Sequence, residues 1–318
     1  MTVDVYLTPE QLDESLRADA RRGLTSSPKW LSPTWLYDER GGELFDQITR
    51  LPEYYPTRTE RSLLQQHSSE LADEARPEML VELGSGSSEK TEILLDALRP
   101  YIHTYVPQDV SEVALQSAVT RLSVEYPDLT VRGVVGDFTG SLTHLPGGGR
   151  RLIAFLGGTI GNLAPTERAA FLTDLAAVLE PGEWLLLGIG LVTDPDVLVP
   201  AYDDAAGVTA EFDRNVLNVL NARLGADFEP GKFRHVAVWD PINEWIEMRL
   251  EATEPMTVRI PGLDLEIAFE EGEHLRTEIS AKFRLDGMGR ELTEAGFVVR
   301  REWIDPDGRF ALIGASRS

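Results

Sequence analysis

Polar and apolar positions predict helices in the first quarter of the chain and a different pattern after it. Two long stretches between residues 8 and 75 have a helical pattern, LTPEQLDESLRADARRGL and GGELFDQITRLPEYYPTRTERSLLQQHSSELADEA. Threonine followed by proline is typical of a helix start, so we expect the first helix to open at Thr8 and Pro9. From Met79 onward, short apolar runs alternate with amphipathic stretches.

The apolar runs after Met79 are predicted to be strands: MLVELG, HTYVPQDV, LTVRGVVGDF, RRLIAFLGG and WLLLGIGLV. The stretches between them are predicted to be helices: SSEKTEILLDALRPY, SEVALQSAVTRLSVEYP and PTERAAFLTDLAAVLEPG. Strands that alternate with helices in this way favour a parallel sheet with helices on both faces.

This alternation stops after Thr193 and resumes near the end of the chain. A helical stretch and several strands follow Thr193, and then come the helix AKFRLDGMGRELTEAGF and the strand pair VVRREWI and RFALIGASR. A sheet that closes with such a hairpin has the strand order of the class I methyltransferase fold, an α/β, Rossmann-like fold. We expect residues 61–195 and 281–318 to form this domain, and residues 1–60 and 196–280 to form a second α+β lobe.

The loop VELGSGSSEKT, residues 81–91, is the first candidate for ligand binding. Its residue types do not fit the two common phosphate loops. A dinucleotide fingerprint needs a third glycine where Glu89 stands, and a Walker loop needs a glycine directly before Lys90. Glycines still let the backbone approach a ligand closely. Lys90 could bind the carboxylate of a methionine moiety, or it could be a solvated lysine in the first turn of a helix.

Acidic residues follow the next two predicted strands. Asp109 could accept hydrogen bonds from both ribose hydroxyls, although NAD enzymes use the same device. Asp137 and Phe138, in GDF, place a carboxylate beside an aromatic ring, which suits an adenine. Together with the loop at Gly84, these residues favour S-adenosylmethionine over NAD, and we expect the sheet domain to bind it.

Composition narrows the choice of partner. The net charge of −23 argues against nucleic acid, and WLLLGIGLV is about half the length of a membrane span. The absence of cysteine excludes disulfides, cysteine-ligated zinc and thiol catalysis, and the five histidines have no metal-ligand spacing. We expect a cytoplasmic, monomeric protein with a small-molecule substrate, without a metal, and without a nucleic-acid or membrane partner.

The acceptor side is less specific. Asn162, in FLGGTIGNLAP after the fourth strand, offers a neutral donor and acceptor, but asparagine at a loop before a helix is more often a cap than a ligand. Glu278 and Ser280 are two residues apart in a predicted strand, so both face one side. Other polar or aromatic candidates in irregular or interrupting segments are Tyr54, Tyr202 and Met248. These residues alone indicate a methyltransferase whose acceptor is unidentified.

Several segments together resemble the histidine-specific N-alpha-methyltransferases of ergothioneine biosynthesis: FDQITRLPEYYPTRTE, VELGSGSSEKT, GDF, FLGGTIGN, AYDDAAGVTAEF and TEISAKF. The resemblance runs over nearly the whole chain. It implies an enzyme that moves three methyl groups from S-adenosylmethionine to the α-nitrogen of L-histidine, giving hercynine. Two alternatives stay open, which are a same-fold enzyme for another amino acid and a protein that binds S-adenosylmethionine without turnover.

The resemblance also implies roles for individual residues. The cofactor would be held by Gly84, Lys90, Asp109, Asp137 and Phe138. The carboxylate and amine of histidine would be held by Tyr54, Asn162 and Tyr202, with Tyr37 near the amine, so that Tyr37 and Asn162 are the catalytic candidates. The imidazole would be held by Glu278 and Ser280, with Met248 lining the pocket. One departure is Gly190, where related sequences often carry aspartate; it puts local packing in doubt more than activity.

Overall fold

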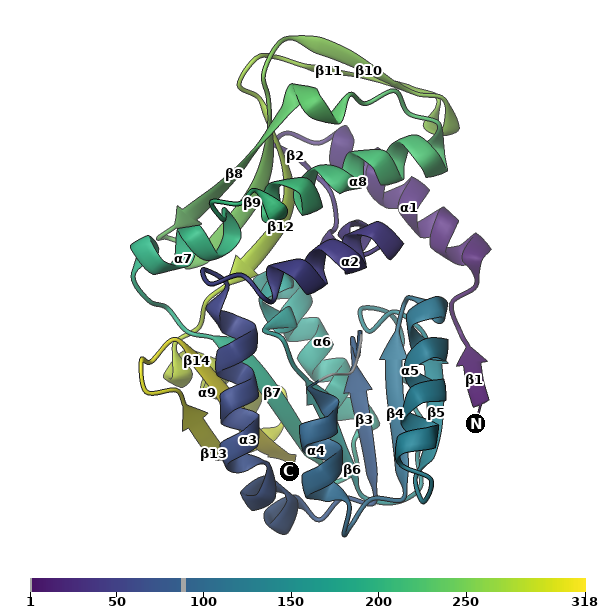
Figure 1. Ribbon diagram of the computed structural model, residues 1–318, viewed down its shortest axis with the longest axis vertical. Helices are drawn as coiled ribbons and strands as arrows, with labels where there is room; N and C mark the ends of the chain where they lie inside the picture. The colour runs from purple at the N-terminus through teal and green to yellow at the C-terminus, as the bar shows by residue number, and fades with distance from the viewer. Residues whose placement is uncertain (1, 87–89) are drawn as a thin grey trace. The chain divides into compact units, whose positions relative to one another are not determined.

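The computed structural model describes residues 2–86 and 90–318, and the chain divides into two compact units (Figure 1). Unit 1 comprises Met1–Leu7, Pro56–Val192 and Lys282–Ser318, and unit 2 comprises Thr8–Tyr55 and Thr193–Ala281. Residues 1–7 thus belong to unit 1, whereas the sequence pattern groups them with the other lobe. In the part of the chain that the structure describes, no helix has both the length and the apolar character needed to span a membrane.

Unit 1 is built on an eight-stranded sheet with the order β1-β5-β4-β3-β6-β7-β14-β13. Its strands are β1 (Thr2–Val5), β3 (Met79–Leu83), β4 (Thr104–Asp109), β5 (Thr130–Val135), β6 (Arg151–Phe155), β7 (Trp184–Gly190), β13 (Phe297–Ile304) and β14 (Phe310–Arg317). The strands β5, β4, β3, β6 and β7 pair in parallel, and β14 pairs antiparallel with both β7 and β13. The predicted α/β fold with a closing hairpin is confirmed.

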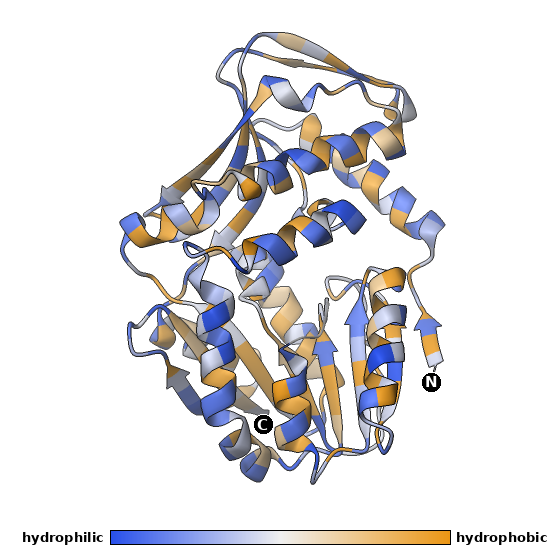
Figure 2. Ribbon diagram, in the orientation of Figure 1, coloured by the Kyte–Doolittle hydropathy of each residue, from blue (hydrophilic) through white to orange (hydrophobic). Residues whose placement is uncertain are grey.

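Helices cover both faces of this sheet. They are α3 (Tyr55–Ala75), α4 (Thr91–Leu98), α5 (Glu112–Glu125), α6 (Pro165–Val178) and α9 (Leu285–Glu294). Figure 1 shows α3, α4 and α5 in front of the sheet and α6 behind it. Side chains of α3, α4 and α5 form one buried cluster with the strands, and Figure 2 shows β7 largely apolar, as burial on both faces requires.

The strand order reverses between β3 and β6, the two central parallel strands. Connections from β3 lead to one edge of the sheet, and those from β6 lead to the other. Right-handed crossovers then place the helices of the two halves on opposite faces. Loops that leave the two central strands diverge at such a reversal, so the carboxyl ends of these strands are where open sheets of this kind bind ligands.

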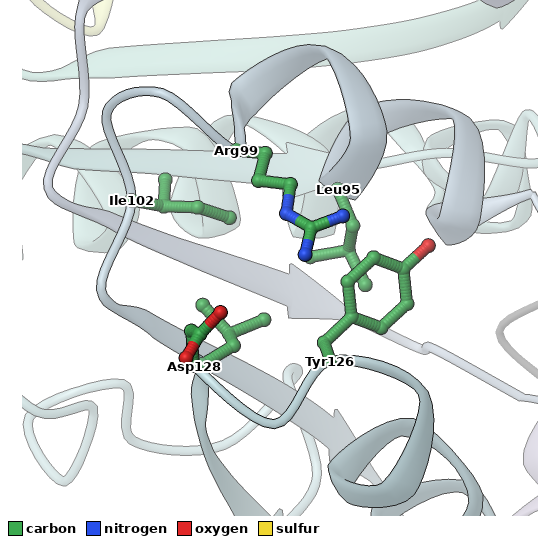
Figure 3. Close-up of a pocket in the computed structure, with 6 residues that line it drawn as sticks. Leu95, Arg99, Ile102, Tyr126 and Asp128 are labelled. Carbon is green, nitrogen blue, oxygen red and sulfur yellow. The ribbon is translucent and has the colours of Figure 1, made fainter.

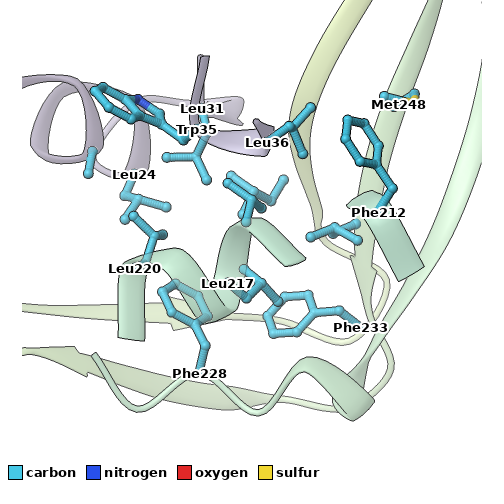
Figure 4. Close-up of a cluster of buried hydrophobic side chains, with 14 of the residues drawn as sticks. Leu24, Leu31, Trp35, Leu36, Phe212, Leu217, Leu220, Phe228, Phe233 and Met248 are labelled. Atoms are coloured by element: carbon cyan, nitrogen blue, oxygen red, sulfur yellow. The ribbon is translucent and has the colours of Figure 1, made fainter. Parts of the chain in front are cut away.

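Unit 2 combines a four-stranded sheet, in the order β2-β12-β9-β8, with a hairpin of β10 and β11 and four α-helices. The strands are β2 (Lys29–Trp30), β8 (Phe233–Asp240), β9 (Trp245–Ala252), β10 (Met256–Ile260), β11 (Leu265–Phe269) and β12 (His274–Ala281). The helices are α1 (Pro9–Leu24), α2 (Glu39–Ile48), α7 (Pro195–Tyr202) and α8 (Val208–Leu224). Figure 4 shows part of its core, where Phe212, Leu217 and Leu220 of α8 meet side chains from the sheet and from the N-terminal segment.

Local signals explain where several of these helices begin. Thr8 caps α1 in a capping box with Gln11, as the predicted helix start requires. The Asp38 side chain accepts from the backbone N–H of Gly41 at 2.8 Å and caps α2. Asp204 accepts from the backbone N–H groups of Val208 and Thr209, at the start of α8. Part of the segment AYDDAAGVTA is therefore explained by its position at the start of α8.

Candidate active site

The carboxyl ends of four adjacent strands in unit 1 bring the predicted cofactor residues to one edge of the sheet. Gly84 follows β3, Asp109 ends β4, Asp137 follows β5, and a glycine loop follows β6. The parallel registers of β3 with β4 and of β4 with β5 keep these ends level. Four segments of different sequence origin therefore lie side by side at the point where ligands of such sheets bind.

The loop after β3 is shaped by glycine. Gly84 has φ +66°, a conformation that residues with a side chain rarely adopt. The N–H groups of Gly84 and Ser85 donate to the Gln108 carbonyl at 2.9 and 3.1 Å. A methyl group on Gly84 would lie 3.7 Å from the Phe138 ring, so the bare glycine leaves room beside the ring. Glu89, which occupies the third-glycine position of the dinucleotide pattern, lies outside the described residues.

Asp109 holds the glycine loop through its carboxylate. Its two carboxylate oxygens accept from the backbone N–H groups of Gly86 and Ser111, each at 3.0 Å. Burial raises the pKa of Asp109 above the ordinary value, and the bonds from Ser111 and Gly86 oppose that rise. A carboxylate has about four acceptor positions, so these two bonds leave capacity for hydroxyl donors.

Asp137 and Phe138 have separate tasks. One oxygen of Asp137 accepts from the N–H and the hydroxyl of Thr139, at 2.8 and 2.7 Å, which fixes the turn after β5. The Phe138 ring packs edge to face on Phe155 and Phe171, with ring centroids 5.0 and 6.0 Å apart. The ring is therefore supported from below by the core while Phe138 itself stays partly exposed.

Lys90 is not a solvated lysine. Its ammonium group forms an ion pair with Glu60 of α3, whose side chain is fully buried. The Lys90 side chain is 23 % exposed, so the ammonium group is held at the edge of the protein interior. The interpretation of Lys90 as a free surface residue in the first turn of α4 is therefore wrong.

Asn162 does not cap the helix that follows it. It ends the short 3₁₀ helix η2 (Thr159–Asn162), and the N-cap of α6 is Ala164. The Ala164 N–H donates to the Glu167 side chain at 2.9 Å, which satisfies that helix end. The helix-cap interpretation of Asn162 is thus wrong, and its amide is available for another role.

In unit 2, three predicted residues share one face of the sheet. Glu278 of β12 pairs with Met248 of β9 in the antiparallel register, and directly paired residues point to the same side. Ser280 stands two residues after Glu278 and points the same way. All three are buried, at 7, 3 and 6 % exposure for Glu278, Met248 and Ser280. Glu278 is therefore a buried carboxylate and not a solvated one on the strand surface.

The predicted tyrosines lie in a connected aromatic cluster of unit 2. The Tyr54 and Tyr202 rings pack edge to face, with centroids 6.0 Å apart. Tyr37 packs in the same way on Phe45 and Phe212, at 5.5 and 5.4 Å. Phe45 also contacts Tyr54 at 6.2 Å, so one chain of rings joins the three tyrosines.

Tyr202 connects this aromatic cluster to the polar face of β12. Its hydroxyl lies 2.9 Å from the Ser280 hydroxyl. Burial raises the pKa of Tyr202 above its ordinary value, and the charge of Glu278 adds to that rise, whereas the bond with Ser280 opposes it. The phenol therefore stays protonated, able to donate one hydrogen bond and to accept others.

The sequence pattern missed the groups that hold Tyr202 from behind. His235 of β8 lies with Nε2 2.8 Å from the Tyr202 carbonyl and Nδ1 2.6 Å from Asp213 of α8. Both partners are acceptors, so the ring carries both protons. A histidine in a strand and an aspartate in a helix gave no signal of this pairing, because the two lie 22 residues apart.

The Gly190 position is filled by a neighbour. A methyl group added there would lie 3.2 Å from Cδ and 3.5 Å from Nζ of Lys282, a buried residue. The glycine thus makes room for the lysine side chain at the end of β7. An aspartate in this place would face the Lys282 ammonium group, which gives the departure from related sequences a local physical meaning.

A small cavity in unit 1 lies away from these residues (Figure 3). It is lined by Leu95, Arg99, Ile102, Tyr126, Asp128 and Leu129. These residues precede β4 and β5 or end the helices before them, so the cavity lies at the amino ends of the strands.

Among the described residues, no group of three or more carboxylate or histidine side chains could hold a metal ion.

Comparison with known proteins identifies the family. Residues 16–317 match the family described as histidine-specific methyltransferase, SAM-dependent. The histidine N-alpha-methyltransferase of Mycolicibacterium smegmatis is 51 % identical over 314 residues, which cover 98 % of each chain. Ergothioneine biosynthesis protein 1 of Schizosaccharomyces pombe is 30 % identical over 253 residues, 75 % of this chain and 31 % of that protein.

Among solved structures, an S-adenosylmethionine-dependent methyltransferase from Clostridium acetobutylicum superposes with a TM-score of 0.50 at 12 % identity, covering 87 % of this chain and 98 % of that one. This likeness concerns the fold, and the family match covers nearly the whole chain. The chain belongs to the family of S-adenosylmethionine-dependent, histidine-specific methyltransferases.

Proposed function

We propose that this enzyme transfers three methyl groups from S-adenosylmethionine to the α-amino nitrogen of L-histidine and releases hercynine, as a step of ergothioneine biosynthesis. Family membership supplies the reaction class. The observation that carries the choice of substrate is the buried polar face of unit 2, where Tyr202 bonds to Ser280 beside Glu278. An apolar amino acid could not exchange hydrogen bonds with that face as an imidazole can, at a cost in free energy.

The edge of the unit 1 sheet fits the cofactor. Gly84 lies close to the Phe138 ring and carries no side chain, which suits a flat ring or a closely approaching ligand backbone. We assign the ribose hydroxyls to Asp109, the adenine to Asp137 and Phe138, and the methionine carboxylate to Lys90. When bound there, S-adenosylmethionine supplies an electrophilic methyl group.

On the acceptor side, we assign the imidazole of histidine to Glu278 and Ser280, with Met248 against the ring. Histidine titrates near 6.5, so the ring is mostly neutral at neutral pH and presents one N–H. Glu278 can accept that N–H, and the Ser280 hydroxyl can donate to the other nitrogen. The hydrogen bond between the Tyr202 and Ser280 hydroxyls restricts the orientation of Ser280.

The amino acid end is assigned to Tyr54, Tyr202 and Asn162, with Tyr37 near the amine. Methyl transfer needs a neutral amine whose lone pair is aligned with the reacting carbon. The reference pKa of an α-amino group is about 7.7 to 8.0, so a useful neutral fraction exists without a strong base. Neutral hydroxyl and amide groups can orient this amine without the competing ion pair that a carboxylate would add.

The decisive experiment is incubation of the enzyme with S-adenosylmethionine and histidine, followed by mass measurement of the product. We expect addition of three methyl groups and formation of three S-adenosylhomocysteine molecules for each histidine consumed. A panel of the other amino acids, including tryptophan and phenylalanine, serves as the control for specificity. Phenylalanine and leucine should be very poor substrates, by as much as about 10⁴-fold, because their side chains cannot make the hydrogen bonds that an imidazole makes.

Two results would contradict this function. Preferred methylation of another amino acid would keep the reaction class and refute the role of Glu278 and Ser280 as imidazole ligands. Tight binding of S-adenosylhomocysteine without any turnover of histidine would indicate a binding protein instead of an enzyme.

A further inference from the structure

Glu60 is a fully buried carboxylate at the cofactor edge of unit 1, and the function described above leaves it without a role. One of its oxygens accepts from the Lys90 ammonium group, and the other accepts from the backbone N–H of Gly157 at 2.7 Å. Lys90 precedes α4, and Gly157 belongs to the loop after β6. A single side chain of α3 therefore joins the loops that leave the two central strands of the sheet.

Glu60 has no exposed surface, so it cannot touch a ligand directly. Removing a carboxylate from water is costly unless charged or hydrogen-bonding partners replace the water. Here Lys90 supplies the opposite charge and Gly157 a hydrogen bond, one for each oxygen. Any effect of Glu60 on a ligand must therefore pass through these two partners.

The sheet has room for the Glu60 side chain because the neighbouring residue of β7, Gly188, has no side chain. A methyl group on Gly188, in the middle of β7, would lie 2.1 Å from Oε1 of Glu60. The overlapping atom is the end of the Glu60 side chain, so a methyl group on Gly188 would displace the carboxylate from its present position. A methyl group on Gly157 would lie 3.7 Å from Nζ of Lys90, an ordinary contact, so this loop and the Lys90 ammonium group are close neighbours.

A second buried acid, Glu82, lies near the ion pair of Glu60 and Lys90. Burial raises the pKa of Glu82 on β3 to about 7, although bonds from Thr91 and Tyr105 and the charge of Lys90 oppose the rise. The Thr91 and Tyr105 hydroxyls donate to one Glu82 oxygen at 2.5 and 2.6 Å. Glu82 thus accepts hydrogen bonds from neutral hydroxyl groups, whereas the ammonium group of Lys90 donates to Glu60.

We propose that Glu60 is the positioning residue of the cofactor site, which fixes the Lys90 ammonium group and the Gly157 N–H so that Lys90 meets the cofactor carboxylate in a single orientation. This inference rests on the proposed function, because it takes Lys90 to bind the methionine end of S-adenosylmethionine. Fixing a flexible lysine before binding lowers the entropy lost when the ligand arrives.

The test is the affinity for S-adenosylhomocysteine, measured by calorimetry in the full-length protein. Glu60→Gln keeps the size and one acceptor for Gly157 but turns an amide, with its own N–H groups, toward Lys90. We expect the Kd to rise by about tenfold or more, as for the loss of a charge-assisted bond. Melting temperature is recorded for every variant.

Glu183→Gln is the matched control. Glu183 is also buried and ion-paired, to Arg151, which begins β6, and it stands just before β7. Arg151 and Glu183 therefore lie at the amino ends of β6 and β7, whereas Glu60 bonds to the loop at the carboxyl end of β6. We expect this variant to lower the melting temperature while the Kd for S-adenosylhomocysteine stays within about twofold of the wild type.

A double-mutant cycle separates positioning from direct contact. If Glu60 acts through Lys90, Glu60→Gln should change the Kd by less than about threefold in a Lys90→Met background. Losses that multiply in the double variant would show that the two residues act independently and would overturn the proposal. A Glu60→Gln variant that binds as tightly as the wild type would overturn it as well.

Two further variants serve if Glu60→Gln does not fold. Glu60→Asp keeps the charge at a shorter reach, and we expect an affinity between those of Glu60→Gln and the wild type. Gly188→Ala moves the carboxylate without altering its charge, and we expect weaker binding that Glu60→Asp partly restores. Wild-type affinity in both would refute the proposal. Because binding is measured without histidine, a failure of histidine methylation in the wild type would refute the proposed function alone.

Discussion

Glu278 is a carboxylate that strand β12 keeps away from water, with Met248 opposite and Ser280 on the same face. We expect Glu278→Ala to lower kcat/KM for histidine at least about tenfold, since a charge-assisted hydrogen bond is worth about 1.5 to 3 kcal/mol. The double variant Glu278→Ala with Met248→Val should shift the ratio of tryptophan to histidine activity toward tryptophan, because the pocket loses both polarity and bulk.

The control for this change is Glu266→Ala, which removes an exposed strand carboxylate from the same unit. It should leave both activities close to those of the wild type. A tryptophan-to-histidine ratio that does not move in the double variant would show that Glu278 does not bind the imidazole.

Asp109 is expected to matter twice, through the ribose and through the loop that it holds. Asp109→Ala should weaken S-adenosylhomocysteine binding by at least about tenfold, since hydrogen bonds to a charged group are worth about 1.5 to 3 kcal/mol each. Asp305→Ala is a matched control, because Asp305 also accepts backbone N–H groups, from Arg309 and Phe310, but in the closing hairpin. Calorimetry on both variants checks this, and equal affinity in Asp109→Ala and the wild type would refute the ribose assignment.

Substitution of Asn162 is expected to affect catalysis and not cofactor binding. Asn162→Ala should lower kcat with histidine by about tenfold or more, while the affinity for S-adenosylhomocysteine changes little, because its amide is assigned to the acceptor amine. Glu167→Ala, which removes the bond to the Ala164 N–H at the start of α6, should instead affect the melting temperature. Turnover at the wild-type rate in Asn162→Ala would exclude the catalytic assignment.

At the residue scale, spacing within one strand is readable from sequence and pairing between strands is not. Glu278 and Ser280 could be placed on one face because side chains in a strand alternate. That Met248 stands opposite Glu278 depends on the register of two strands, which a local pattern does not contain. For the same reason nothing near Glu60 indicated Lys90, 30 residues away.

At the scale of elements, α7 carries Tyr202 at its last position, and β8 and α8 hold that end through His235 and Asp213. Burial opposes the charge of His235, but Asp213 and the Tyr202 carbonyl outweigh it and raise the pKa of this histidine. A folded pKa above the unfolded one stabilises the protein fully below the unfolded value, near 6.5, and the stabilisation is lost as pH rises through the folded value.

We therefore expect the contribution of this pair to shrink between pH 6 and pH 9. The measurement is the melting temperature of the wild type minus that of the double variant His235→Gln with Asp213→Asn, followed across this range. Exposed His103 provides the comparison, and His103→Gln should give a difference that does not follow this trend. A gap that is constant or grows with pH would show that His235 is not the charged partner of Asp213.

The elements that sequence patterns missed are the two shortest strands at sheet edges. β1 has four residues and β2 has two, so neither is long enough to show a repeated pattern. Each forms because a distant strand offers free backbone groups, β5 for β1 and β12 for β2. The long strands and helices were predictable because burial imposes a period on them, whereas an edge strand takes its order from its partner.

At the scale of the whole molecule, β14 comes after every other strand in chain order yet lies inside the sheet, between β7 and β13. Seven of its eight residues are buried, among them Phe310, Leu312 and Ile313. Each large apolar side chain contributes about 1.5 to 3 kcal/mol by burial, so their sum is comparable to the total stability of an ordinary domain.

Deletion of residues 310–318 should therefore abolish cooperative thermal unfolding, which calorimetry or circular dichroism would detect. Deletion of residues 2–5 removes an edge strand of half the length, which is only partly buried, and should lower the melting temperature by a few degrees at most. A cooperative transition that survives the first deletion would contradict this view of β14.

The interior place of β14 also has a consequence for how the protein is made. While the chain is being synthesised, β7 lacks its native partner on this side until residues 310–317 leave the ribosome, and its edge is apolar. Such an edge invites pairing with other chains. Loss of residues 310–317 should thus be more harmful to solubility in the cell than loss of residues 2–5, and chaperones that shield unpaired strands should matter most until β14 has paired with β7.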